Sequence, residues 1–351
     1  MRARTTVAGA VLVAAALAVS GCQTQGASTA TGDQAKDNGP VTIFVGGQSK
    51  VIYLPARLTE QLGYFKDQGL DVKLVDTAAG VTAETALVAG QAQAVVGFYD
   101  HTIDLQSKGK CIKSIVQFAN VPGEAEVVSK SDASSITQAA DFKGKKLGIT
   151  STGSSTDFLT HYLTSKGGVP TSGYTTVQAG ADAKFIAAMT SGGIDAGMTT
   201  DPTIAKLTST GQAKVLLDMR TPDGTKAALG GLYPASSLYV SCDWLDKNPK
   251  TAQKLANAFV KTLKFINDND AAAIAAKMPA DYASGDKALY IKALNDSKGM
   301  FTPDGVIDED GAKNVLAVLG ASSPSVKPHK DSIDVTKTYT TQFVKAAASQ
   351  G

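Results

Sequence analysis

Short apolar runs alternate with helical patterns along this chain, and the alternation starts a second time after residue 120. The strand-like runs fall into two sets: 41–47, 70–76, 92–98 and 111–118, then 145–150, 174–178, 194–199 and 213–218. Strands that alternate with helices are typical of a parallel sheet with helices on its faces. We therefore expect an α/β protein with two lobes, each a mostly parallel sheet flanked by helices.

The C-terminal third has a different pattern, because nearly all of it is helical after a strand-like run at 235–242. In residues 248–268, Leu255, Phe259, Leu263 and Ile266 recur at helical spacing and form an apolar stripe. Such a helix needs an apolar surface to cover, and the first lobe is the simplest candidate. We expect a first lobe made of residues 41–120 and 236–351, and a second lobe of residues 121–235.

The N-terminus has the features of an export signal. Arg2 and Arg4 precede an apolar stretch too short to span a bilayer, and Val19-Ser20-Gly21-Cys22 resembles the lipobox of bacterial lipoproteins. We predict that residues 1–21 are a signal peptide, that Cys22 is lipidated, and that residues 22–40 form a flexible polar tether. The protein would then be exported and anchored by lipid to the outer face of the cell membrane. The alternative is an ordinary cleaved signal and secretion.

Charge and cysteine content exclude several classes of function. The chain has 34 Lys and Arg against 32 Asp and Glu, so losing Arg2 and Arg4 with the signal makes it neutral. A neutral chain gives no electrostatic reason to bind nucleic acid. Cys111 and Cys242 can pair in an oxidising compartment, but two buried free thiols are the favoured interpretation. No CxxC or clustered histidine is present, and we expect no metal and no other cofactor.

Ligands of open parallel sheets bind beyond the carboxyl ends of the strands. The loops at those ends are rich in glycine, hydroxyl and amide residues: 46–53, 77–82, 97–102, 150–156, 178–183 and 199–202. Residues 150–156, "TSTGSST", precede a predicted helix whose first N–H groups have no internal partner and favour an acceptor or an anion. The alternative is an ordinary N-cap, for which Ser154 or Ser155 would suffice.

Several segments resemble one family of binding proteins. "LGYFKDQGLDVKLV" (62–75), "ALVAGQAQAVVG" (86–97) and "TSGGIDAGMTTDPT" (190–203) are similar to substrate-binding proteins of ABC importers for sulfonates, taurine, nitrate and thiamine precursors. The resemblance covers about residues 41–266. It implies a two-lobed periplasmic-binding-protein-like fold with a ligand cleft between the lobes. It also implies a monomeric, non-enzymatic receptor that closes on a small organic solute and delivers it to a permease with a cytoplasmic ATPase.

The same resemblance, carried over by position, predicts the residues that line the cleft. The first lobe would supply Gln48, Lys50, Tyr53, Gly80, Val81, Phe98, Tyr99, Asp100 and His101. The second lobe would supply Thr152, Gly153, Ser154, Ser155, Thr156, Thr199, Thr200 and Asp201.

Ordinary structural roles compete with several of these assignments. Lys50 could be a solvated loop residue and Tyr53 part of the core, while Asp100 and Asp201 could be helix N-caps. His101 is interpreted as a ligand contact rather than as a catalytic group, although Asp100 lies beside it.

We expect an anionic or strongly accepting solute, with a sulfonate or carboxylate favoured over a cation. The cleft would offer mostly donors, namely Lys50, the hydroxyls and the free N–H groups. Tyr53, Phe98 and Tyr99 would stack on a flat organic body.

Two other functions fit the same fold. A relative that makes the thiamine pyrimidine is an enzyme with a cysteine-rich segment, but this chain has no such segment and no GxSxG, HExxH or P-loop pattern. A lipid-tethered ligand sensor is equally compatible with the sequence, and neighbouring genes for a permease and an ATPase would favour import.

Overall fold

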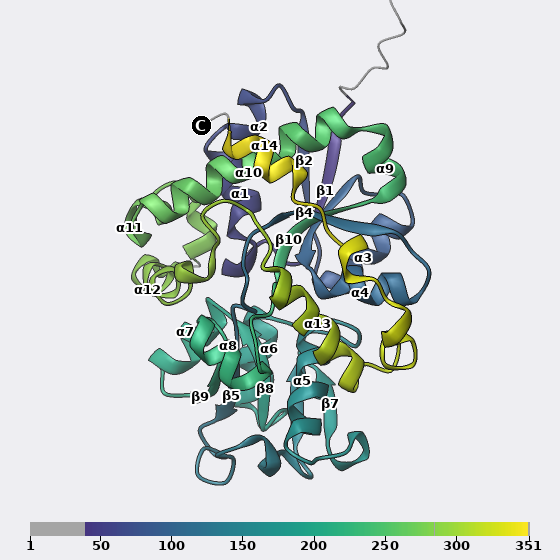
Figure 1. The fold of residues 1–351 in the computed structure, drawn as a ribbon. Coiled ribbons are helices and arrows are strands. Elements are labelled where there is room, and N and C mark those ends of the chain that lie inside the picture. The colour runs from purple at the N-terminus through teal and green to yellow at the C-terminus, as the bar shows by residue number, and fades with distance from the viewer. Residues whose placement is uncertain (1–38, 284, 350–351) are drawn as a thin grey trace, which may run out of the picture. The chain divides into compact units, whose positions relative to one another are not determined.

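The computed structural model describes residues 39–283 and 285–349, which form two lobes, each with one five-stranded mixed sheet (Figure 1). The first sheet has the order β2-β1-β3-β10-β4 and contains β1 Val41–Val45, β2 Val72–Asp76, β3 Ala94–Phe98, β4 Ile112–Gln117 and β10 Ser236–Ser241. The second has the order β7-β6-β8-β5-β9 and contains β5 Glu124–Ser129, β6 Lys146–Ile149, β7 Thr175–Gln178, β8 Ala196–Thr200 and β9 Ala213–Asp218. The α/β class predicted from the alternation is confirmed.

The two sheets share one topology. In each, a single strand runs antiparallel to its neighbours, β10 in the first and β5 in the second. The chain therefore passes between the sheets twice, once before β5 and once before β10. The two passages are paired, because the N–H groups of Tyr233 and Ala235 donate to the carbonyls of Asn120 and Ala119 at 3.1 and 2.9 Å.

The helices flank these sheets in the order expected from the alternation. Their bounds are α1 Leu54–Gln61, α2 Tyr64–Asp67, α3 Gly80–Val88, α4 Asp100–Ser107, α5 Ser155–Lys166, α6 Asp182–Thr190, α7 Thr203–Ser209, α8 Pro222–Leu229, α9 Cys242–Lys247, α10 Pro249–Asp268, α11 Ala271–Ala275, α12 Lys287–Ser297, α13 Glu309–Ser322 and α14 Gln342–Ala348. Residues 54–67 form two helices, α1 and α2, because Gly63 between them adopts a φ of 76°. Within the described residues, no helix combines the length and apolarity needed to cross a bilayer.

The predicted stripe of α10 is buried against the first lobe. Leu255, Phe259, Leu263 and Ile266 are inaccessible to solvent, and the Phe259 ring lies 5.3 Å from that of Phe65 between centroids. The later helices also contact the second lobe, since α12 contacts α7, and α13 contacts α5 as well as α4 of the first lobe (Figure 1). Both have apolar faces, and α13 shares a core with the second lobe because its buried Val315 belongs to the same cluster as Leu159 of α5.

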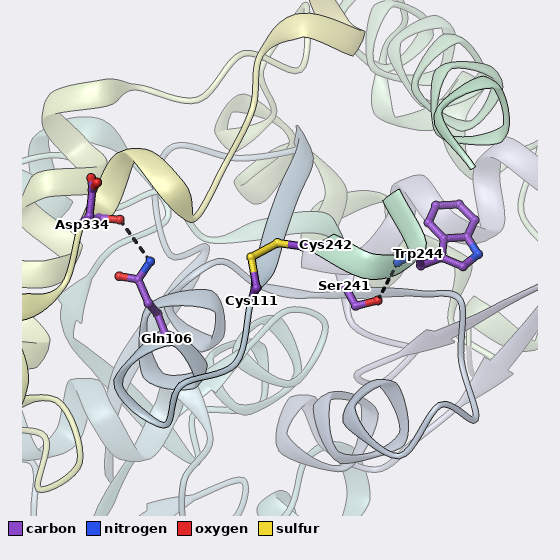
Figure 2. Close-up of a disulfide and its surroundings, with 6 residues drawn as sticks. All are labelled: Gln106, Cys111, Ser241, Cys242, Trp244 and Asp334. Carbon is purple, nitrogen blue, oxygen red and sulfur yellow. Dashed lines mark hydrogen bonds between the residues drawn. A yellow bond between two sulfur atoms is a disulfide. The ribbon is translucent and has the colours of Figure 1, made fainter. Parts of the chain in front are cut away.

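Cys111 and Cys242 form a disulfide, so the interpretation as two free thiols is wrong (Figure 2). Their Cα atoms are 5.4 Å apart although 131 positions separate them in sequence. The pairing arises because β10 returns antiparallel beside β4, and the Cys242 N–H donates to the Cys111 carbonyl at 3.0 Å. The bond thus joins the chain just before β4 to the chain just after β10. Cys22, the predicted lipidation site, lies outside the described residues.

Candidate ligand cleft

The loops at the carboxyl ends of the strands meet at a small cavity lined by both lobes. Its lining residues are Lys50, Ile52, Tyr53, Gly80, Phe98, His101, Glu124, Thr150, Ser154, Ser155, Thr156, Ala181, Thr199 and Thr200. Ten of these belong to the set carried over by position. The cavity has a volume of about 20 Å³, enough for little more than one water molecule. An organic solute therefore enters only if the walls of the cavity move apart.

Lys50 lies in the wall of the cavity and is not a solvated loop residue. Only 6% of it is exposed, and its Nζ donates to the Gly46 carbonyl at 2.8 Å. Burial lowers the pKa of Lys50, although the carboxylates of Glu124, Asp182 and Asp76 oppose this effect. The ring of Tyr53 lies beside it, with its centroid 5.9 Å from Nζ, and meets Phe98 edge to face. The first lobe thus presents a buried amino group beside aromatic side chains.

His101 is paired with a carboxylate that the sequence reasoning missed. Its Nδ1 lies 2.9 Å from Oε2 of Glu84, which sits on α3 one turn after Gly80. Burial lowers the pKa of His101, but the charges of Glu84 and Asp100 outweigh this and raise the pKa to about 9. The imidazole is thus a cation at neutral pH. Gly80 is required here, since a Cβ at that position would lie 2.9 Å from His101 Nε2.

The hydroxyls before α5 bond mainly to their own loop. The Ser154 hydroxyl donates to the Ser151 carbonyl at 2.7 Å, and Thr156 Oγ1 accepts from the Thr150 N–H at 2.9 Å. Ser154 is the N-cap residue by position, but its side chain makes no capping bond. In the described structure, no hydrogen bond is found to the backbone N–H groups of Ser155 and Thr156. The second lobe therefore offers two first-turn N–H donors to the cavity.

Asp100 joins the two lobes and is not a helix cap. Tyr99 is the N-cap of α4, and the buried Asp100 carboxylate accepts from the hydroxyls of Ser155 and Tyr233, both at 2.9 Å. Burial raises the pKa of Asp100 against the opposing effects of His101 and these two donors. The acid therefore holds the start of α5 against the first lobe.

Asp201 was predicted to line the cleft, with a helix N-cap as the alternative, and it lies outside the cavity lining. The N-cap of α7 is Pro202, one position later than expected. Asp201 Oδ1 accepts from the Ala205 N–H at 3.0 Å, and Oδ2 accepts from Arg220 at 2.9 Å and from Ser297 of α12 at 2.6 Å. The carboxylate thus connects the second lobe to the C-terminal helices.

Five further residues of the predicted set do not line the cavity. Tyr99 is buried and hydrogen-bonds to Thr338 of the C-terminal segment. Gln48 lines a neighbouring, larger cavity, and Thr152 is exposed. Gly153 has a φ of 79° and faces Val81, since a Cβ on Gly153 would lie 3.7 Å from Val81 Cγ2.

Glu124 is the most important lining residue that the sequence reasoning missed. It is 2% exposed, and its Oε2 has no hydrogen-bond partner among the described residues. Burial and the charge of Asp100 raise the pKa of Glu124 well above its usual range. A signal was present, because Glu124 and Glu126 interrupt an otherwise apolar strand. No cluster of potential metal ligands occurs in the described part of the chain.

Two lobes, each built on a mixed sheet, with a cleft at the strand ends are the features of the periplasmic-binding-protein fold. The protein has this fold. The chain belongs to the NMT1/THI5-like family, whose model matches residues 53–273, more than half of its length. This confirms the resemblance noted in the sequence.

Solved structures agree with the family assignment. A protein from Bordetella bronchiseptica RB50 is 37% identical, with a TM-score of 0.85, over 90% of this chain and 98% of that one. The alkanesulfonate-binding protein SsuA from Xanthomonas axonopodis pv. citri, bound to MOPS, shares the fold at 20% identity with a TM-score of 0.64, over 79% of this chain and 91% of that one.

The curated relatives include yeast enzymes. A 4-amino-5-hydroxymethyl-2-methylpyrimidine phosphate synthase, THI13 of Saccharomyces cerevisiae, is 26% identical over 240 residues, which is 64% of this chain. The match spans 66% of the relative's own length, slightly less than two thirds.

Proposed function

We propose that the protein is the extracytoplasmic receptor of an ABC importer, anchored by lipid on Cys22. It captures a small organic solute between its two lobes and delivers it, as a monomer, to the transmembrane permease. The lobes correspond to residues 41–120 with 236–351 and to residues 121–235. The fold of sulfonate-binding neighbours supports this class of receptor.

The observation that carries the proposal is the convergence of donors from both lobes. Lys50 and the cationic His101 come from the first lobe, and the first-turn N–H groups of α5 come from the second. Because a charged acceptor gains most from such donors, the solute carries a sulfonate, a carboxylate or a comparable group.

Capture involves a movement of the two lobes about the paired passages. The cavity admits about one water molecule, so the lobes separate for entry and close on the solute. The backbone pairs between Ala119 and Ala235 and between Asn120 and Tyr233 lie where the chain changes lobes, and they are the proposed hinge.

Lys50→Met should weaken binding of the best anionic probe by about one to two decades, because a hydrogen bond to a charged group contributes about 1.5–3 kcal/mol. Calorimetry with ethanesulfonate, propionate and choline measures this. Thr152→Ala is the matched control, since Thr152 lies in the loop before α5 but is exposed. A preference for choline, or equal affinities of Lys50→Met and the unmodified protein, would contradict the proposal.

Cys22→Ala should move the protein from the membrane fraction to the medium when it is expressed in a bacterium that processes lipoproteins. In this proposal the lipid on Cys22 binds the membrane, and residues 22–40 contain no apolar stretch that would bind it instead. Immunoblotting of the two fractions measures the effect, with Ser28→Ala in the same segment as control. If Cys22→Ala stays with the membranes, the anchor lies elsewhere.

An enzyme on this fold is the second candidate, and the yeast synthases are the observation that favours it. The two functions differ in the fate of the solute. A receptor returns its solute unchanged after denaturation, whereas an enzyme releases a product that mass spectrometry detects.

A further inference from the structure

A second and much larger cavity lies next to the cleft. It has a volume of about 470 Å³, within the usual range for pockets that bind small organic ligands. Gln48 and Asp76 line it from the first lobe, Asp182 and Ile186 from the second, and Tyr282 and Tyr290 from the C-terminal segment. A ligand in this cavity would therefore contact all three parts of the fold.

This cavity shares no lining residue with the cleft. The two cavities are neighbours, because adjacent residues of the chain line them. Ser49 and Asp182 line the large cavity, whereas Lys50 and Ala181 line the cleft. Their lining chemistry differs, because acidic and tyrosine side chains surround the large cavity and donors surround the cleft. The large cavity is suited to a different ligand.

Four carboxylates in the wall of the large cavity have no cationic partner. Asp182 accepts from the Ser49 hydroxyl at 2.7 Å, Asp76 from the Gln48 N–H at 2.7 Å, and Asp286 from the Leu289 N–H at 2.9 Å. Neither these three nor Asp281 takes part in an ion pair with any described residue. No ion pair neutralises them, although Lys50 in the neighbouring cleft interacts electrostatically with Asp182 and Asp76.

The two basic residues in the wall do not cancel this charge. Arg57 forms an ion pair with Glu60, which lies outside the lining. Lys206 is the other cation and is exposed. The carboxylates outnumber the available cation, so the cavity attracts positive charge.

Gln48 adds a directional donor. It is 8% exposed, and its Oε1 accepts from Arg57 at 2.7 Å and from the Tyr282 hydroxyl at 3.3 Å. These two donors fix the orientation of the amide, and its Nε2 has no partner in the described chain. The free amide N–H groups can donate to an acceptor oxygen of a ligand in the cavity.

We infer that this cavity is a binding site for a small protonated amine that also carries an acceptor oxygen and an aromatic or cyclic apolar body. The ammonium group lies among Asp182, Asp281 and Asp286, and the oxygen accepts from Gln48. The apolar body packs on Tyr282, Tyr290 and Ile186, where aromatic faces also favour a cation. This site is independent of the anionic solute proposed for the cleft.

Calorimetry with three probes tests the inference: 2-amino-1-phenylethanol, its neutral analogue 1-phenylethanol, and the anion 3-phenylpropionate. We expect the amine to bind at least tenfold more tightly than the alcohol at low ionic strength. The double variant Asp182→Asn/Asp286→Asn should reduce this preference to less than threefold and leave the affinity for the alcohol unchanged.

Both substitutions preserve local structure. Asn tolerates the positive φ of 53° at Asp182, and Asn at position 286 still caps α12. Asp310→Asn removes one exposed carboxylate of α13 that lies outside the cavity lining, so this control should keep the full preference. Equal binding of amine and alcohol, a preference for the anion, or a double variant with unchanged preference would overturn the inference.

Discussion

The unfolding free energy should fall between pH 5 and pH 8, and this fall should be smaller in Glu126→Gln than in the unmodified protein by on the order of 3 kcal/mol. Glu126 lies on β5, is 1% exposed, and neither carboxyl oxygen has a hydrogen-bond partner in the described structure. Burial raises the pKa of this acid to about 8. The unmodified protein must therefore lose stability as the pH rises.

The direction follows from proton binding. Below pH 4.5 both states hold the proton, and between pH 4.5 and about 8 the unfolded chain releases it while the folded chain retains it. Ionisation therefore favours the unfolded state throughout this window. His101 acts in the same direction, because its stabilising charge is fully present below pH 6.5 and is lost as the pH rises through about 9.

Urea unfolding followed by circular dichroism at pH 5, 6, 7 and 8 measures the effect. Glu309→Gln is the matched control, since Glu309 is exposed at the start of α13 and should leave the slope unchanged. If Glu126→Gln keeps the slope of the unmodified protein, the buried acid is not the group that titrates.

The double variant Cys111→Ala/Cys242→Ala should lower the unfolding free energy by about 4 kcal/mol. The disulfide closes a loop with a sequence separation of 131 that contains β5 to β10, including all five strands of the second sheet. Removing it gives the unfolded chain a large conformational freedom that the oxidised chain lacks. The loss should appear as a lower urea midpoint.

Reduction provides an internal control for this effect. Dithiothreitol should bring the unmodified protein to the midpoint of the double variant and should not change the double variant itself. If the double variant is as stable as the oxidised protein, the disulfide makes no net contribution to the unfolding free energy.

Local patterns in the sequence determined much of the fold. The alternation of strands and helices depends on residues close in sequence, and it predicted both sheets. The stripe of Leu255, Phe259, Leu263 and Ile266 identified the face of α10 that is buried. Of the predicted site, Lys50, Tyr53, Gly80, Phe98 and His101 do reach the cavity, because loops at the carboxyl ends of parallel strands must converge.

The tertiary structure alone decided the partners of these residues. Asp201 does accept a first-turn N–H of α7, but Asp201 also accepts from Ser297, and Asp100 from Tyr233, which both lie far away in sequence. Glu84 of α3 meets His101 of α4 only in the folded structure, since the two residues lie on different helices. The sequence alone could not reveal such pairs, since local periodicity carries no information on contacts between distant segments.

The sequence by itself determined the α/β class, the order of the elements and the family. Only the tertiary structure decided the disulfide, the bridging by α12 and α13, and the cavity beside the cleft. The physical reason is the range of the interactions involved. Strands and helices follow from hydrophobic periodicity within some ten residues, whereas Cys111 meets Cys242 because β10 inserts antiparallel between β3 and β4 after the second lobe is complete.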